Sequence, residues 1–588
     1  MARTKIARIF RATGPHARLA ESEHATLSST ISRLNRLFRR LDLAPVCGSY
    51  RAMRFARWLS VFATTTTLWA CAPQAALPAK SPPTEPAKTE WKQVEPAQQK
   101  VPLVPAPVGV PPADPSCQEY LSHTSETCKP PASAAETARD RLAQALNAGT
   151  PPERDAQLAC LESDTSLPPG ILRALRAEFA PLGCADLIAL PYLEPRRAEL
   201  DRSIEDALIA LASAGRLARL VQKAPELSAP FDKPHFMEFF QSTLKPWIVT
   251  QAQAIHELSL SASHLTQYAK GVVAIEAGLA DMRFVSVVRQ VALPKEMNDD
   301  AEVRDAYYAA LDEALEPRKA RGRDAALVGL RELAKEWILV DPRVERARAL
   351  LSEVYSGRRI DALDKLLLLP LKPALADTTE RKLALRLPTF YASYLLADAT
   401  HDAPLLRALL ERGLPRSLAT HWEPSKLDEG GQELLARALI ERGRRYFQAA
   451  DFAVAAQLSS GNHPSPERAL DFALASSLQN GPRDASELIL RGPQLPGGAV
   501  QVAELDRLAA EKNNPSAPLA AFDAAYLLGL APPQNDAKFW DAQAKRFESA
   551  ARTLKDPAQK RLAHDLAAAA KDTARALASS RPSPTPNK

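Results

Sequence analysis

The sequence predicts an all-α protein, specifically an irregular α-solenoid of about twenty helices that follows a disordered, proline-rich linker. Ala, Leu and Arg are plentiful, and these residues are among the better helix formers. Alternating runs of Val, Ile and Thr are nearly absent, which argues against a large sheet. Pro and Gly recur at short intervals, as in "LVDPRVERA" and "QNGPRDASE". We therefore expect helices of about 10–25 residues that stack as hairpins.

The basic character of the chain is confined to its beginning. The formal net charge is +6, but residues 1–71 hold 12 of the 75 Lys and Arg and only 3 of the 69 Asp and Glu. The remaining 517 residues therefore carry 63 basic and 66 acidic side chains. They show no basic stripe of the kind that binds phosphates, so a nucleic-acid partner is not expected.

Residues 53–71 have the features of an export signal. Residues 53–57, "MRFAR", form a short basic region, and the 13 residues from 58 to 70 carry no charge. A membrane-spanning helix needs about 20 apolar residues, so this run is too short to span a bilayer comfortably.

The signal ends in Leu68-Trp69-Ala70-Cys71, which resembles the lipobox of bacterial lipoproteins. The resemblance implies that Cys71 is lipidated and becomes the mature N-terminus, although a smaller residue is usual in place of Trp69. Ala72, rather than Asp, follows the cysteine, which is compatible with sorting to the outer membrane. Two alternatives are cleavage after Ala72, next to the unfavourable Pro73, and a chance apolar stretch with a buried cysteine.

Residues 1–52 are predicted to be a spurious or disordered extension, because Met53 is placed as an initiator of the signal would be. The alternatives are a long basic region with a helix near residues 31–43, or an Arg-rich organelle transit peptide.

Residues 72–116 are predicted to be a disordered linker. They contain 12 prolines in 45 residues, and proline favours extended polyproline II. At ~3.1 Å per residue the fully extended limit is about 140 Å, enough to hold a folded body away from a lipid surface. A ligand for aromatic-lined grooves is the alternative. Residues 581–588 are predicted to be a disordered tail.

The body, residues 117–580, contains Cys117, Cys128, Cys160 and Cys184, an even number that suits disulfides in an exported protein. The short spacing favours a Cys117–Cys128 bridge, and Cys160–Cys184 would then staple two helices that flank "SLPPG". The second loop would contribute about 3 kcal/mol by chain entropy. Four buried free thiols are the alternative.

Two helix starts are predicted near the beginning of the body. "SAAE", Ser133 to Glu136, is a capping box. A long helix follows Pro195, and its apolar positions keep the helical period at Ile204, Leu208, Leu211 and Ala218.

One window resembles a tetratricopeptide repeat. Leu439, Gly443, Tyr446 and Ala455 match the family's apolar, glycine, tyrosine and alanine positions, whereas Ser459 stands where phenylalanine is usual. Nothing comparable recurs 34 residues later, which favours a generic helix hairpin in an irregular array over regular repeats.

A second window, "APLLRALLERG" at residues 403–413, resembles the second helix of an ankyrin repeat. It has neither a neighbouring repeat nor the family's opening turn, so it too is expected to be part of a generic helix hairpin.

No catalytic residue is predicted. Ser242 and Lys245 match the S-x-x-K of penicillin-binding enzymes, and residues 460–462, "SGN", match their S-x-N. The K-T-G element and the mixed α/β fold are missing, so chance explains both matches.

No metal site and no cofactor are predicted. His256 and His264 are eight residues apart, whereas zinc proteases place two histidines four residues apart on a helix. The acidic pair Asp299-Asp300 is better explained as charge at a helix N-terminus.

The leading functional hypothesis is a non-catalytic scaffold of the bacterial cell envelope. The protein would be held at the membrane, with the outer membrane favoured, by the lipid on Cys71 and would face the periplasm. Its solenoid would bind an envelope protein or a peptidoglycan-associated component. The alternative is a cell-wall hydrolase or transferase with unrecognised acidic catalytic residues.

Overall fold

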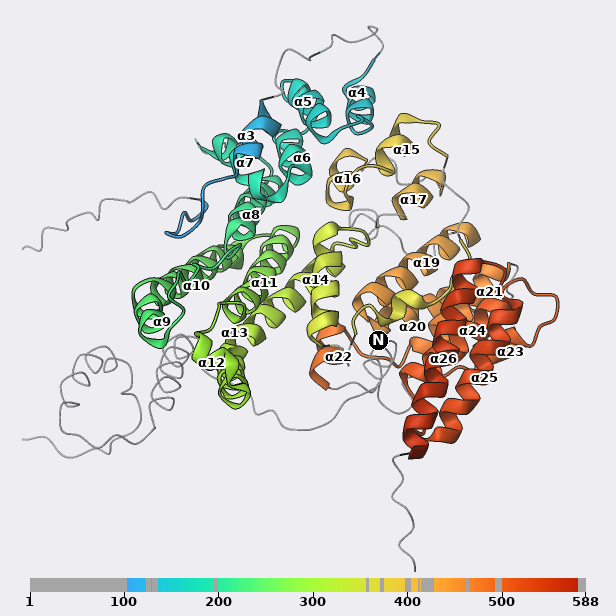
Figure 1. Ribbon diagram of the computed structural model, residues 1–588. Coiled ribbons are helices and arrows are strands. Elements are labelled where there is room, and N and C mark those ends of the chain that lie inside the picture. Colours follow the sequence, from blue (N-terminus) through green and yellow to red (C-terminus); the bar gives the residue numbers. More distant parts are fainter. Residues whose placement is uncertain are drawn as a thin grey trace, which may run out of the picture.

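The computed structural model describes residues 103–122, 128, 136–194, 199–355, 359–370, 375–396, 403–410, 413, 428–461, 465–491 and 500–579. Every regular element in this part of the chain is a helix; the one β-type contact is an isolated bridge between Ile338 and Gly413. The all-α prediction is confirmed. Figure 1 shows the helices following one another across the molecule, from the α3–α8 end to the α23–α26 end.

The first group of helices packs in sequence order. Its members are α3 (Pro115–Leu121), α4 (Ala138–Ala145), α5 (Pro151–Leu161), α6 (Ile171–Phe179), α7 (Ala185–Leu193) and α8 (Arg202–Arg219). Helix α4 begins after Thr137, whose hydroxyl accepts from the Asp140 amide in a capping box. The predicted box at Ser133 and Glu136 is therefore displaced by four residues. In α8, Ile204, Leu208 and Leu211 are buried as predicted.

The central group contains the most extensive contact between two helices in the described chain, that of α11 (Gln267–Arg289) with α13 (Ala301–Lys335). The group also comprises α9 (Lys233–Phe239), α10 (Lys245–Leu260), α12 (Lys295–Asp299) and α14 (Pro342–Val354). Helix α11 packs along both α8 and α13.

Two glycine pairs bring α11 and α13 together. A Cβ atom on Gly278 would lie 2.7 Å from the carbonyl oxygen of Gly322. A Cβ on Gly329 would lie 2.9 Å from the carbonyl oxygen of Gly271. Real Cβ atoms do not approach so closely, so only glycine allows this backbone-to-backbone contact. The glycines are seven residues apart on each helix, which places each pair on one helical face.

Three short helices come next, and the first two of them return to the first group. They are α15 (Thr379–Ala384), α16 (Thr389–Leu395) and α17 (Ala403–Leu410). Helix α15 packs on α4, as Figure 1 also shows, and the Thr379 hydroxyl bonds the Asp140 carboxylate. The helices therefore do not pack only with their neighbours in sequence, because α15 packs on a helix that lies more than 200 residues earlier in the chain.

The helices of the last group again pack in sequence order, except α22 (Ala485–Arg491), which contacts α13 of the central group. The helices of the last group are α19 (Glu429–Tyr446), α20 (Ala449–Ser459), α21 (Pro466–Leu478), α22, α23 (Ala503–Ala509), α24 (Ala517–Leu530), α25 (Ala537–Thr553) and α26 (Pro557–Ser579). Many helices start at proline after a capping Asp, Ser or Thr, as the proline punctuation predicted.

Candidate functional site

Two largely non-helical segments lie against the helices, whose side chains donate hydrogen bonds to the backbone carbonyls of both segments. Residues 103–114 are named the N-terminal strap, and residues 359–370 the central strap. Because binding of an extended chain is the activity expected of an interaction scaffold, the two strap sites are the candidate functional sites.

The N-terminal strap is held by side chains of α8 and α10. Arg216 donates to the carbonyls of Val104, at 3.2 Å, and Pro105. Gln251 donates to the Gly109 carbonyl at 2.9 Å. Prolines lack an amide hydrogen, so a proline-rich segment offers chiefly acceptors, which arginine and glutamine side chains can satisfy.

This strap corrects the linker prediction for residues 103–116. They were expected to be disordered and without a core, but Val104 is only 3% exposed, and residues 115 and 116 begin α3. Residues 72–102 lie outside the described residues.

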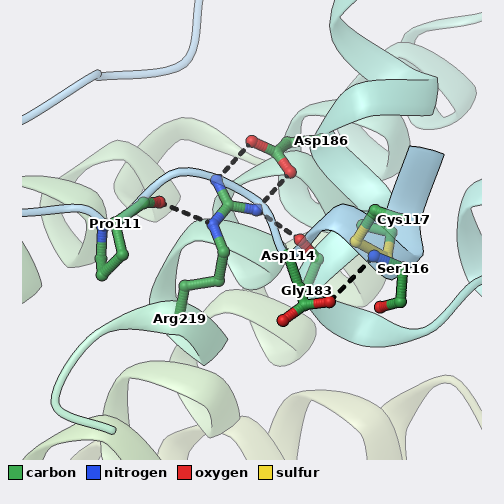
Figure 2. Close-up of a disulfide and its surroundings, with 8 residues drawn as sticks. Pro111, Asp114, Ser116, Cys117, Gly183, Asp186 and Arg219 are labelled. Atoms are coloured by element: carbon green, nitrogen blue, oxygen red, sulfur yellow. Dashed lines mark hydrogen bonds and ion pairs between the residues drawn. A yellow bond between two sulfur atoms is a disulfide. The ribbon is translucent and has the colours of Figure 1, made fainter. Parts of the chain in front are cut away.

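Arg219 joins the strap to the rest of the first group. Figure 2 shows its guanidinium between the Pro111 carbonyl and the Asp186 carboxylate, and it also bonds the Gly183 carbonyl. The two bonds to Asp186 measure 2.7 and 2.8 Å, a paired geometry that is stronger than a single neutral hydrogen bond.

A disulfide anchors the chain directly after the strap. Cys117 in α3 is bonded to Cys184 just before α7, as Figure 2 shows, and Cys128 is bonded to Cys160 in α5. All four predicted cysteines form disulfides, but the predicted pairing of Cys117 with Cys128 and Cys160 with Cys184 is wrong.

The pairing error has a structural reason. The segment between Cys160 and Cys184 contains a complete helix, α6, which packs against both α5 and α7. The two cysteines therefore do not lie on neighbouring helices. Cys117, on α3, instead meets the residue that precedes α7.

The central strap is bound by α19 and α24. Its short 3₁₀ turn, Ala362–Lys365, is followed by an extended stretch, residues 366–370. Arg444 of α19 donates to the carbonyls of Leu363 and Asp364 at 3.1 Å and of Leu366 at 3.3 Å. Tyr526 of α24 donates to the Ala362 carbonyl at 2.6 Å.

A buried ion pair orients the next contact. Arg437 of α19 donates to the Leu369 carbonyl at 2.7 Å and pairs with Asp471 of α21 at 2.8 Å. Both side chains are almost wholly buried. Burial raises the pKa of Asp471, and the neighbouring guanidinium opposes that rise. Asp471 therefore holds the Arg437 side chain in the position from which it donates to the strap.

Asp523 of α24 accepts a hydrogen bond from the backbone of the strap. Its Oδ1 accepts from the Leu367 amide at 2.8 Å. The residue is 0% exposed, and within the described chain its Oδ2 has no hydrogen-bond partner. Burial raises the pKa of this carboxyl well above its usual range, against the effects of the Leu367 amide and Arg444.

Besides the two strap sites, a polar cluster lies in the core where α16 packs against α6 of the first group. Glu178 accepts from the Tyr268 hydroxyl at 2.7 Å, from the Tyr391 hydroxyl at 3.4 Å and from Arg343, which also pairs with Asp341 at 3.1 Å. Burial raises the phenol pKa of both tyrosines. The carboxylates share one buried guanidinium, so the cluster joins α6, α11, α14 and α16.

The catalytic motif matches do not converge. The Ser242 hydroxyl is exposed and donates to the Glu238 carbonyl, while Ser460 caps α20 and donates to the Gln457 carbonyl. Lys245 begins α10, and Figure 1 shows α10 and α20 well apart. Asn462 lies outside the described residues.

The histidines do not form a metal site. His256 lies in α10, His264 is exposed after it, and the described chain contains no cluster of three metal-ligating side chains. Asp300 caps α13 and accepts from the amides of residues 302 and 303, as expected of a helix N-terminal charge.

The tetratricopeptide-like window is a helix hairpin. Leu439, Tyr446 and Ala455 are buried between α19 and α20 or beside them. A Cβ on Gly443 would lie 2.9 Å from the Phe452 ring, which explains the glycine. Ser459 is buried where the family usually has phenylalanine.

The ankyrin-like window contains α17. Gly413 follows this helix and lies against the Trp337 carbonyl. A Cβ atom added to Gly413 would be only 2.2 Å from that carbonyl oxygen.

Sequence reasoning missed the straps and most of the side chains that bind them. The only local signals are an acid in an apolar helix, Asp523 in "FDAAYLLGL", and a leucine run without helical period at residues 366–369.

The predicted lipobox with Cys71, the extension 1–52 and the tail 581–588 lie outside the described residues. No described helix is long and apolar enough to cross a membrane. No protein-family model, curated protein or solved structure matches the chain.

Proposed function

We propose that the protein is a non-catalytic scaffold of the bacterial cell envelope, anchored by a lipid on Cys71 and binding a partner protein through its helical body. The observation that carries this proposal is the pair of strap sites, in which helices bind an extended chain by its backbone. The same chemistry suits binding of a separate polypeptide.

The two disulfides support an oxidising location. Disulfides persist in exported proteins and are rare in the reducing cytosol. Both bridges of the described chain lie in the first group of helices, next to the N-terminal strap.

The N-terminal strap also suits an anchored protein. A lipid at Cys71 would leave residues 72–102 between the membrane and the first bound residue. Pulling on that segment would act on Arg216, Gln251 and Arg219 before it reached α3. The attachment would therefore be shared between α8 and α10.

The anchor is tested by labelling cells with a clickable fatty acid. Wild-type protein should be labelled and partition with membranes, and Cys71→Ala should abolish both. Thr64→Ala, a change in the uncharged run ahead of Cys71, is the matched control and should keep both. Equal labelling of wild type and Cys71→Ala would contradict the lipoprotein proposal.

Partner binding is tested separately by cross-linking in intact cells followed by purification from membranes. Recovery of the same envelope protein with wild type and with Cys71→Ala relocated to the periplasm would support binding through the body. Recovery only with the lipidated form would indicate colocalisation rather than binding.

A further inference from the structure

The central strap is bound in the way that a protein binds a peptide ligand. Five of its carbonyls, from Ala362 to Leu369, accept hydrogen bonds from side chains of α19 and α24. A segment that belonged to a helix or sheet would pair its backbone mainly with other backbone groups. The strap also buries Ile360, Leu363 and Leu366 in the core. A second chain could therefore occupy the site if it offered the same carbonyls together with apolar side chains such as leucine.

The receiving side chains are held in position by their own partners. Arg437 is paired with Asp471, and Arg444 lies near Glu441 at 3.3 Å. Arg348, only 1% exposed, holds Asp364 of the strap at 2.6 Å. Prior positioning of a site lowers the ordering cost of binding.

The strap fills this site incompletely. Asp523 presents two buried oxygens, but the strap donates a hydrogen bond only to Oδ1. Leu366, Leu367, Leu368 and Leu369 have no polar side-chain atom, so this stretch has no further side-chain donor to offer. A buried polar atom without a partner costs free energy. A ligand hydroxyl can donate to a carboxylate oxygen or accept from a protonated carboxyl, so a ligand that supplies one gains over the strap.

We propose that the central strap site binds an extended, leucine-rich segment of a partner protein that carries a hydroxyl group beside its leucines, and that the strap is the built-in competitor for this segment. The inference rests on the proposed role as a protein-binding scaffold, and it adds the chemistry of the partner segment. A tethered strap competes at an effective concentration on the order of millimolar, so free peptides bind weakly until the strap is weakened.

The test uses the full chain without its signal and fluorescein-labelled peptides in a fluorescence anisotropy titration. The first peptide copies residues 361–370, "DALDKLLLLP", and two others carry serine in place of Leu367 or Leu368. The strap is weakened by Leu363→Ala with Leu366→Ala, which removes two buried side chains. Far-UV circular dichroism is used to check that the variant is still helical.

The copied peptide should bind the weakened variant at least tenfold more tightly than wild type. Adding Arg444→Ala should remove most of that binding, because three carbonyl contacts are lost. Arg445→Ala is the matched control: it lies on the same helix but bonds Glu345 rather than the strap, and should leave binding unchanged.

At least one serine peptide should bind the weakened variant about tenfold more tightly than the copied peptide, and Asp523→Ala should abolish that gain. No binding to the weakened variant, or binding that ignores Arg444→Ala, would overturn the proposal. Equal affinity of all three peptides would overturn the hydroxyl requirement.

If the double variant loses its helical signal, the single variant Leu368→Ala replaces it, because the Leu368 side chain is only half-buried. The expected order of peptide affinities is the same. The titration requires neither lipid nor envelope, so its failure is distinct from failure of the anchor or of partner recovery in cells.

Discussion

The N-terminal and central straps are both held against the helices, but by different means. Both are extended and both present carbonyls to arginine side chains. The N-terminal strap is followed within three residues by the Cys117–Cys184 disulfide, whereas the central strap has no covalent bond to the helices that bind it. The central strap also faces a buried carboxyl, Asp523, that it satisfies only in part. One strap is therefore covalently anchored next to its end, and the other is the strap that we propose a partner segment can replace.

Removing the disulfide should have the largest effect on this contrast. Cys117→Ser with Cys184→Ser opens a loop of 67 residues, which by chain entropy lowers the free energy of unfolding by about 4 kcal/mol. Denaturant unfolding measures the loss, and limited proteolysis should then cut within residues 103–116. Cleavage in the central strap instead would contradict the separate roles of the two straps.

Breaking the buried pair should weaken the central strap almost as much. Arg437→Ala removes a strap contact and leaves Asp471 buried without its cation, which costs about 3 kcal/mol. The expected result is a lower unfolding midpoint in urea. Arg575→Ala, an exposed residue of α26 that pairs only with its helical neighbour Asp572, is the control and should change the midpoint little.

The buried carboxyl predicts a pH dependence. Because burial raises the folded-state pKa of Asp523, the folded protein holds a proton that the unfolded chain releases above about pH 4. Stability from this group is complete below that pH and falls as pH rises, by up to about 1.4 kcal/mol per unit until the folded-state pKa is reached. Asp523→Asn should lose this dependence, so its advantage over wild type in urea should grow from pH 4 upward. A constant difference across pH would contradict a raised pKa.

The smallest effect is expected at the N-terminal strap. Gln251 bridges the strap to the Val221 amide, because its Oε1 accepts from Val221 at 2.9 Å while its Nε2 donates to Gly109. Gln251→Ala should lower the free energy of unfolding by about 1–2 kcal/mol. With the disulfide intact, proteolysis of residues 103–116 should stay slow; rapid cutting would show that the hydrogen bonds, not the disulfide, fix this strap.

The features that local sequence determines were predictable. Composition and proline punctuation predicted the helices, and an even cysteine number predicted disulfides. The partners in long-range contacts were not predictable from the sequence. Arg437 meets Asp471, and Cys117 meets Cys184, only because whole helices pack together. The same holds for the straps: nothing in residues 361–370 reveals that Arg444 and Asp523 will meet them.

The glycine contacts between α11 and α13 have a consequence for motion. At Gly271, Gly278, Gly322 and Gly329 the two backbones touch with no intervening side chain. A side chain can change rotamer to let helices slide, but a backbone cannot. We therefore expect this pair to be the stiff part of the array and bending to occur in the helices on either side of it. The two straps lie on opposite sides of that pair in the chain, so release of one need not disturb the other.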